Sequence, residues 1–245
     1  MFDHVTIRVS DRATSERFYE TVLGGLEVEQ SYAGEYLAEW GDFSLSSATA
    51  NKPVTRGLHV GFSAPSREHV DRFWQVGTNA GYRDDGPPGR RPEYGSDYYG
   101  SFLLDPDGNS AEAVHHGDLR HDGCIDHLWI RVADVAVAKR FYQAIAPQAG
   151  IRPNTDTPER AQFAGSSGSF SLVRGEPTEQ VHMAFPAPDD ATVDEFHRVA
   201  IASGYRDNGA PGARPEYHPG YYGAFVLDPD GNNVEVVHHN RPQPA

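Results

Sequence analysis

The chain has 245 residues, with 21 Lys and Arg against 35 Asp and Glu, a formal net charge of −14. This length suits one large or two ordinary domains, and the acidic balance argues against a nucleic-acid partner. The single cysteine, Cys124, excludes an intramolecular disulfide. No apolar run approaches the ~20 residues of a membrane span, and the N-terminus has no signal-peptide pattern. We therefore expect a soluble cytoplasmic protein with no membrane partner.

The predicted elements of the first quarter of the chain are a strand, a helix and two short strands. Residues 2–9 alternate as a half-buried strand. Asp11 or Thr14 then caps a helix whose apolar residues recur at helical spacing until Gly24-Gly25 weaken it. Two short strands follow at 36–40 and 43–47.

The second quarter follows the same plan. We predict a strand at 57–63, a helix after Pro65, and strands at 98–104 and 110–116. Between them, residues 81–100 are rich in Gly, Pro, Arg and Tyr, a composition that argues against a helix.

Internal repeats extend this plan to the whole chain. When the chain is shifted by 123 residues, the first half aligns with the second: His4 falls on His127, His59 on His182, and Glu112 on Glu235. A shift of 55 residues superposes His4 on His59 inside the first half. The sequence therefore predicts an α+β fold of four βαβββ modules in two domains, at 1–119 and 124–242. Gly117 to Gly123 is the predicted linker.

One motif closes each half. Residues 100–116 (GSFLLDPDGNSAEAVHH) and 223–239 (GAFVLDPDGNNVEVVHH) share 12 of 17 positions. Asp-Pro-Asp-Gly predicts a tight turn, since Pro presets φ and Gly accepts positive φ. Glu112 and Glu235 then lie in otherwise apolar strands, where a buried carboxylate is costly without a cation or good donors. His116 and His239 lie four residues after these glutamates, and therefore on the same face of the strand. Because they stand at the strand ends, we expect them to be solvated and do not assign them as ligands.

These features together resemble the vicinal oxygen chelate superfamily, which includes glyoxalase I, extradiol dioxygenases, fosfomycin-resistance proteins and bleomycin-binding proteins. The resemblance rests on paired βαβββ units, the Asp3-His4-Val5 opening, and the DPDGN turn followed by Glu. It covers nearly the whole chain and implies two tandem half-open barrels.

The resemblance also implies metal sites. Carried over residue by residue, the ligands are His4, His59 and Glu112 in the first half and His127, His182 and Glu235 in the second. Two imidazoles and a carboxylate suit Fe²⁺ or Mn²⁺, with Zn²⁺ or Ni²⁺ as alternatives. The family sometimes builds a barrel from units of neighbouring domains, so His4 could instead share a metal with His182 and Glu235.

A departure from the family pattern bears on the reaction. Glyoxalase I and its closest relatives use a fourth carboxylate ligand, and Ser44 and Ser171 stand at the corresponding places. A four-ligand site would need Glu39 or Asp42 to move in. The three-ligand set is similar to that of extradiol dioxygenases and fosfomycin-modifying enzymes.

Candidate acids or bases lie in residues 81–100 and 204–223. The aromatic and imidazole side chains there could act beside a metal-bound substrate oxygen. The same residues could equally form a packed structural loop. The candidate catalytic residues are Tyr94, Tyr99, Tyr217, His218 and Tyr222.

We therefore predict a metal-dependent enzyme acting on a small substrate that chelates the metal, first of all an extradiol-dioxygenase-like enzyme. A glyoxalase I-like lyase or isomerase is the alternative within the family. A protein that sequesters an antibiotic or metabolite without turnover, like the bleomycin binders, is the alternative of another class. We expect a monomer or a homodimer.

Overall fold

The computed structural model describes residues 1–117 and 123–240. Most of the predicted linker, and the last two residues of the second predicted domain, lie outside this range. Four βαβββ units follow one another, as predicted. Unit 1 holds β1 (His4–Val9), α1 (Arg12–Gly24), β2 (Tyr32–Ala33), β3 (Leu37–Trp40) and β4 (Phe43–Ser47). Unit 2 holds β5 (Leu58–Ser63), α2 (Arg67–Asn79), β6 (Arg83–Arg90), β7 (Tyr99–Leu104) and β8 (Ser110–His115).

The second half repeats this order. Unit 3 holds β9 (Ile125–Val132), α3 (Val135–Ile145), β10 (Arg152–Thr157), β11 (Arg160–Ala164) and β12 (Ser169–Arg174). Unit 4 holds β13 (His182–Pro186), α4 (Asp190–Ala202), β14 (Arg206–Ala213), β15 (Tyr222–Leu227) and β16 (Asn233–His238).

Each sheet combines one unit from each half. Units 4 and 1 form the sheet β14-β15-β16-β13-β1-β4-β3-β2, and units 3 and 2 form β10-β11-β12-β9-β5-β8-β7-β6. The joins are antiparallel pairs, β1 with β13 and β5 with β9. The expectation that each half curls its own two units into a barrel is therefore wrong, and the alternative arrangement between halves is the one observed.

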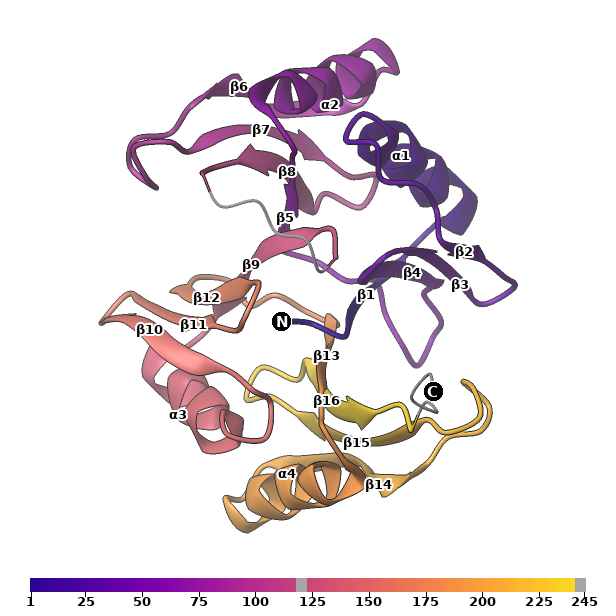
Figure 1. Ribbon diagram of the computed structural model, residues 1–245, viewed down its shortest axis with the longest axis vertical. Coiled ribbons are helices and arrows are strands. Elements are labelled where there is room, and N and C mark those ends of the chain that lie inside the picture. Colours follow the sequence, from indigo (N-terminus) through magenta and orange to yellow (C-terminus); the bar gives the residue numbers. More distant parts are fainter. Residues whose placement is uncertain (118–122, 241–245) are drawn as a thin grey trace, which may run out of the picture.

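The helices lie on the outside of the two sheets (Figure 1). α1 and α2 contact each other beside the first half, and α3 and α4 do so beside the second. Phe18 and Tyr19 of α1 are fully buried, which is the packing that the helical spacing of apolar residues predicts. Within the described residues, no helix combines the length and the apolar character that crossing a membrane requires.

The local signals of the sequence correspond to specific contacts. The Asp11 side chain accepts a hydrogen bond from the Thr14 backbone N–H, so Asp11 is the N-cap of α1. In the turn after β7, Gly108 has φ +86°. Its N–H donates to the Asp105 carbonyl, and the Asp105 carboxylate accepts from the Asn109 N–H. The turn that positions β8 is therefore built as predicted.

One region differs from the prediction. Residues 83–90 and 206–213, taken as irregular, form the strands β6 and β14. Each lies at the edge of its sheet, where a strand tolerates proline because one side of its backbone needs no partner. The pairing of β6 with β7 shifts register on both sides of Gly86. These irregularities hide the alternating pattern that identifies a strand.

Candidate metal centres

Two clusters of possible metal ligands lie on the inner faces of the sheets. Centre 1 consists of His4, His182 and Glu235, and centre 2 of His59, Glu112 and His127. In each cluster, the candidate ligand atoms all lie within 4.8 Å of one another. The structure therefore brings all six predicted ligands into two triads, but each triad draws on both halves. The within-half grouping is wrong because β1 lies beside β13, and β5 beside β9.

The distances within the triads suit a single ion. In centre 2, Glu112 Oε2 lies 2.9 Å from His59 Nε2 and 3.3 Å from His127 Nε2, and the two Nε2 atoms are 3.3 Å apart. In centre 1, Glu235 Oε2 lies 2.9 Å from His182 Nε2 and 3.6 Å from His4 Nε2. Ligands at right angles on a metal with ~2.1 Å bonds lie about 3 Å apart. Both donor sets thus fit three adjacent positions of one octahedral ion.

Burial makes the two glutamates expensive without a positive partner. Glu112 and Glu235 are each 1% exposed. Burial disfavours ionised Glu112, but hydrogen bonds from His127 and His59 outweigh it and lower the pKa of Glu112 to about 2. Burial likewise disfavours charged His127, while Asp126 and Glu112 raise its pKa to about 9. Centre 2 is therefore an anionic site that a proton on His127 neutralises in the metal-free protein.

Further polar groups orient the histidines of centre 2. The His127 Nδ1–H donates to the Asp126 carboxylate at 2.9 Å, and His116 Nε2 lies 2.8 Å from the other oxygen of Asp126. His59 Nδ1 bonds to Ser110 Oγ at 3.2 Å, and Ser110 in turn donates to Asp85. Both rings therefore present Nε2 to the triad, as is usual for metal-bound histidine.

Centre 1 has a similar arrangement with different partners. The His4 Nδ1–H donates to Asp3 at 2.8 Å, and Asp3 also accepts from His239. The side-chain amide of Asn233 lies 2.5 Å from His182 Nδ1. His239, like His116, is thus half-buried and bonded to the acid behind a ligand, where the sequence predicted a solvated side chain. Asp3 and Asp126 are functional candidates that the sequence interpretation missed, although each directly precedes a ligand.

A tyrosine holds the second oxygen of each glutamate. The Tyr98 hydroxyl donates to Glu112 Oε1 at 2.8 Å, and the Tyr221 hydroxyl donates to Glu235 Oε1 at 2.6 Å. Gly100 lies next to the carboxylate of Glu112, and a Cβ added to Gly100 would stand 2.5 Å from Glu112 Oε1. The glycine that opens each repeated motif thus leaves room for the carboxylate.

The predicted catalytic residues fall into two groups. Tyr94 lines the pocket of centre 2, and the ring of Tyr217 packs 4.9 Å from Tyr221 near centre 1. His218 contacts His239 and not the triad. The remaining two, Tyr99 and Tyr222, donate instead to carboxylates of the outer helices.

These two assignments are therefore corrected. The Tyr99 hydroxyl bonds to Asp71 of α2, and the Tyr222 hydroxyl bonds to Asp194 of α4. Neighbouring residues of a strand point to opposite faces, so Tyr98 and Tyr221 face the centres instead.

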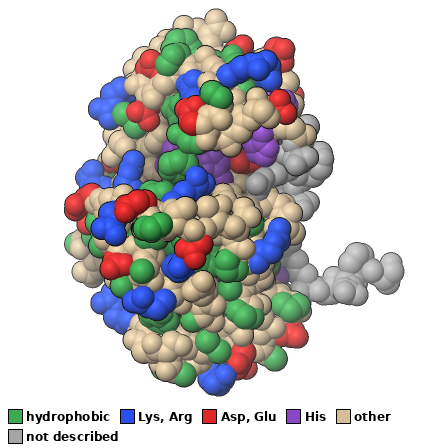
Figure 2. Space-filling view, turned by 90° about the vertical axis from the view of Figure 1, so that its left-hand side faces the viewer, with side chains coloured by type: hydrophobic (Ala, Val, Ile, Leu, Met, Phe, Trp, Pro, Cys, Tyr) green, Lys and Arg blue, Asp and Glu red, His purple; other side chains and the backbone are tan. Residues whose placement is uncertain are grey.

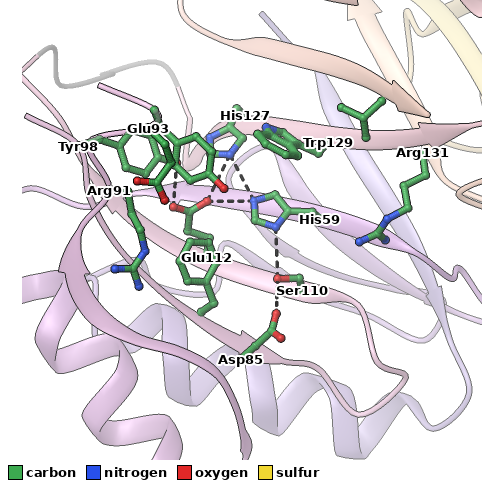
Figure 3. A pocket seen from close by; sticks show the side chains of 13 residues that line it. His59, Asp85, Arg91, Glu93, Tyr98, Ser110, Glu112, His127, Trp129 and Arg131 are labelled. Carbon is green, nitrogen blue, oxygen red and sulfur yellow. Dashed lines mark hydrogen bonds and ion pairs between the residues drawn. The ribbon is translucent and has the colours of Figure 1, made fainter. Parts of the chain in front are cut away.

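Centre 2 opens into a pocket of about 330 Å³, within the size range of small-molecule sites. Figure 2 shows histidine side chains inside a hollow of the molecular surface. Figure 3 shows His127 beside Trp129, His59 and Glu112 below them, and Arg91 and Arg131 on opposite sides. The other lining residues include Asp85, Glu93, Tyr94 and Phe102.

The positions of a fourth ligand hold serines with other partners. Ser44 Oγ lies 2.7 Å from Thr6 Oγ1, and Ser171 Oγ accepts from Arg160. Asp42 accepts from the backbone N–H groups of Cys124 and Ile125 and is not available to centre 1. Glu39 is not among the ligand atoms that converge in centre 1.

Two triads of possible metal ligands inside paired βαβββ units are the features that define this class of fold and site, and comparison with known proteins identifies the family. The family model described as Glyoxalase/Bleomycin resistance protein/Dioxygenase superfamily matches residues 1–113 and 124–236. The chain belongs to this superfamily.

Solved structures with this fold include glyoxalase I from Zea mays, at 19% identity and a TM-score of 0.70, covering 97% of this chain and 92% of that one. A candidate dioxygenase from Bacillus subtilis is similar at 13% identity and a TM-score of 0.67, covering 98% and 85%. At these identities the similarity shows the fold alone. No protein of curated function matches the chain.

Proposed function

We propose that the protein is a metal-dependent dioxygenase, similar to extradiol enzymes, that acts on a small molecule bearing two neighbouring oxygens. The observation that carries this proposal is the three-ligand set of each centre. With serines at the fourth position, an octahedral ion would retain three open positions, enough for two substrate oxygens and O2. Fe²⁺ or Mn²⁺ suits these donors. When bound, the ion would hold and polarise the substrate oxygens.

The protein's own side chains would position the substrate and exchange a proton with it. Tyr98 keeps Glu112 Oε1 occupied, so that Oε2 faces the histidines. Tyr94 is 46% exposed and lines the pocket, so its hydroxyl can reach a substrate oxygen beside centre 2. It is our candidate for the group that accepts or returns a proton there. The side chains of Trp129, Phe102 and Val173 would limit the access of water to part of the bound substrate.

The metal content of the protein tests the proposal first. We expect about two Fe or Mn per chain after purification without chelator or affinity tag. Consumption of O2 should follow on addition of a catechol and should require the metal. Two metals without O2 consumption, but with isomerisation of a hemithioacetal, would favour the glyoxalase-like alternative. Failure to bind Fe²⁺ or Mn²⁺ under anaerobic conditions would refute the enzyme and favour a protein that only sequesters its ligand.

A further inference from the structure

The two centres have the same types of metal ligand, but the residues that surround the ligands differ. The 123-residue shift that superposes the triads places Thr6 on Trp129, Leu37 on Arg160, and Glu39 on Gln162. The strand pairing confirms this equivalence, since Glu39 pairs with Ser44 and Gln162 with Ser171, the two serines that stand at corresponding places. Because the metal ligands are the same, these differences concern what binds beside the metal.

Trp129 provides centre 2 with an aromatic wall. It lies on β9 two residues after His127, and therefore on the same face of the sheet. Its ring centroid is 5.8 Å from that of His59 and 5.6 Å from that of Tyr94. A planar ring entering the pocket can pack against this wall while its oxygens face the triad. Centre 1 has only the Thr6 side chain at this place.

Arg160 gives the same wall a positive charge. Its guanidinium carbon lies 5.0 Å above the Trp129 ring. Nε and Nη2 donate to Ser171 Oγ at 3.1 and 2.9 Å, which uses two of the five guanidinium N–H groups. Arg131, on the same strand as Trp129, lines the pocket, but it does not distinguish the centres, because Arg8 holds the equivalent position and interacts with His182 of centre 1.

The corresponding wall of centre 1 has the opposite character. Leu37 offers no charge, and Glu39 is a half-buried acid that interacts electrostatically with His4. Asp85 and Glu93 do line centre 2, but Asp85 accepts a hydrogen bond from Ser110 on the side away from Trp129. Along this wall, an anionic ligand would therefore meet Arg160 beside centre 2 and Glu39 beside centre 1.

From these contacts we infer that the two centres are not equivalent in ligand choice. Centre 2 selects a planar aromatic ligand that carries a carboxylate, with the ring against Trp129 and the carboxylate at Arg160. Centre 1 does not bind this ligand tightly. This inference rests on the proposed presence of metal at the triads, and it is independent of the proposed oxidation.

The test is calorimetric titration of protein loaded with two Zn²⁺ per chain, a metal that has no redox chemistry. We expect one tight site per chain for 3,4-dihydroxybenzoate. Catechol, which lacks the carboxylate, should bind that site about tenfold more weakly, the effect of losing one charge-assisted contact. Acetohydroxamate, a chelator without a ring, should not distinguish the two centres.

Exchange of the wall residues supplies matched variants. Trp129→Thr/Arg160→Leu should keep two Zn²⁺ and weaken 3,4-dihydroxybenzoate by at least about tenfold. Thr6→Trp/Leu37→Arg should create a second tight site. If the first double variant does not fold, Arg160→Leu alone should weaken 3,4-dihydroxybenzoate and leave catechol unchanged.

Other outcomes would overturn the inference. These are two equal tight sites in the unaltered protein, a tight site that survives the exchange of Trp129 and Arg160, or an inability to bind Zn²⁺. A tight site without O2 consumption by the iron-loaded protein would refute the proposed oxidation and leave the present inference intact.

Discussion

Paired substitutions can test whether each metal centre draws its ligands from both halves. His4→Ala/Glu235→Gln removes two ligands of centre 1, so one metal per chain should remain. His4→Ala/Glu112→Gln removes one ligand from each centre, so both metals should be lost. A grouping within each half gives the reverse, because His4 and Glu112 would then belong to the same site. Glutamine keeps the volume of the buried side chain and an acceptor for the tyrosine hydroxyl, which limits damage to the fold.

The loss of bound metal should also lower the thermal stability of these variants by an amount that can be estimated. A metal present at a hundredfold excess over its dissociation constant stabilises the folded state by about 2.7 kcal/mol. For a chain of this size, 1 kcal/mol corresponds to roughly 2–4 °C in Tm. The variant that loses one metal should therefore lose roughly 5–11 °C of metal-dependent stabilisation, and the variant that loses both should lose about twice as much.

Elemental analysis and thermal unfolding with and without EDTA measure both quantities. EDTA should lower the Tm of the unaltered protein and have no effect on His4→Ala/Glu112→Gln. Glu93→Gln, which changes an exposed acid of the pocket outside the triad, is the control and should retain two metals. Retention of one metal by His4→Ala/Glu112→Gln, with loss of both by His4→Ala/Glu235→Gln, would refute the arrangement between halves.

Four further predictions follow from the structure around centre 2. Because the pKa of His127 is raised from 6.5 to about 9, a metal must displace its proton at neutral pH. The apparent metal affinity of this centre should thus rise about tenfold per pH unit from 7 to 9, and a flat profile would contradict the assignment. The same shift stabilises the metal-free fold below pH 6.5, and this contribution should disappear as the pH rises through 9, which unfolding of the metal-free protein would reveal. Tyr98→Phe should weaken metal binding by about tenfold, while Tyr99→Phe, whose hydroxyl bonds to Asp71, should not change it; equal effects in a metal titration would be inconsistent with the observed hydrogen bonds. Gly100→Ala should crowd Glu112 Oε1 and weaken the metal of centre 2 alone, which site-resolved titration against Glu235→Gln would check.

Much of the fold could be predicted from the sequence because its signals are local. The Asp11 cap, the Asp105–Gly108 turn and the alternation in β8 each depend on residues only a few positions apart. The candidate ligand types also came from the sequence, since the family resemblance assigns them and the 123-residue repeat places the same residue types at matching points of both halves. Residues 83–90 were missed because Gly and Pro interrupt the alternation of an edge strand. The same irregularity obscured which of Tyr98 and Tyr99 faces the centre.

The grouping of the ligands was decided only by the tertiary structure. His4 and His182 are 178 residues apart, and nothing in the apolar pattern of β1 distinguishes β13 from β5 as its partner. The four units carry equivalent strands, so the choice depends on how the complete sheets and the helices outside them pack together. The same holds for Asp3, which lies before β1 and can therefore turn its carboxylate to His4 Nδ1. The sequence by itself thus determined the units and the ligand types, while non-local strand pairing determined which residues can share a metal.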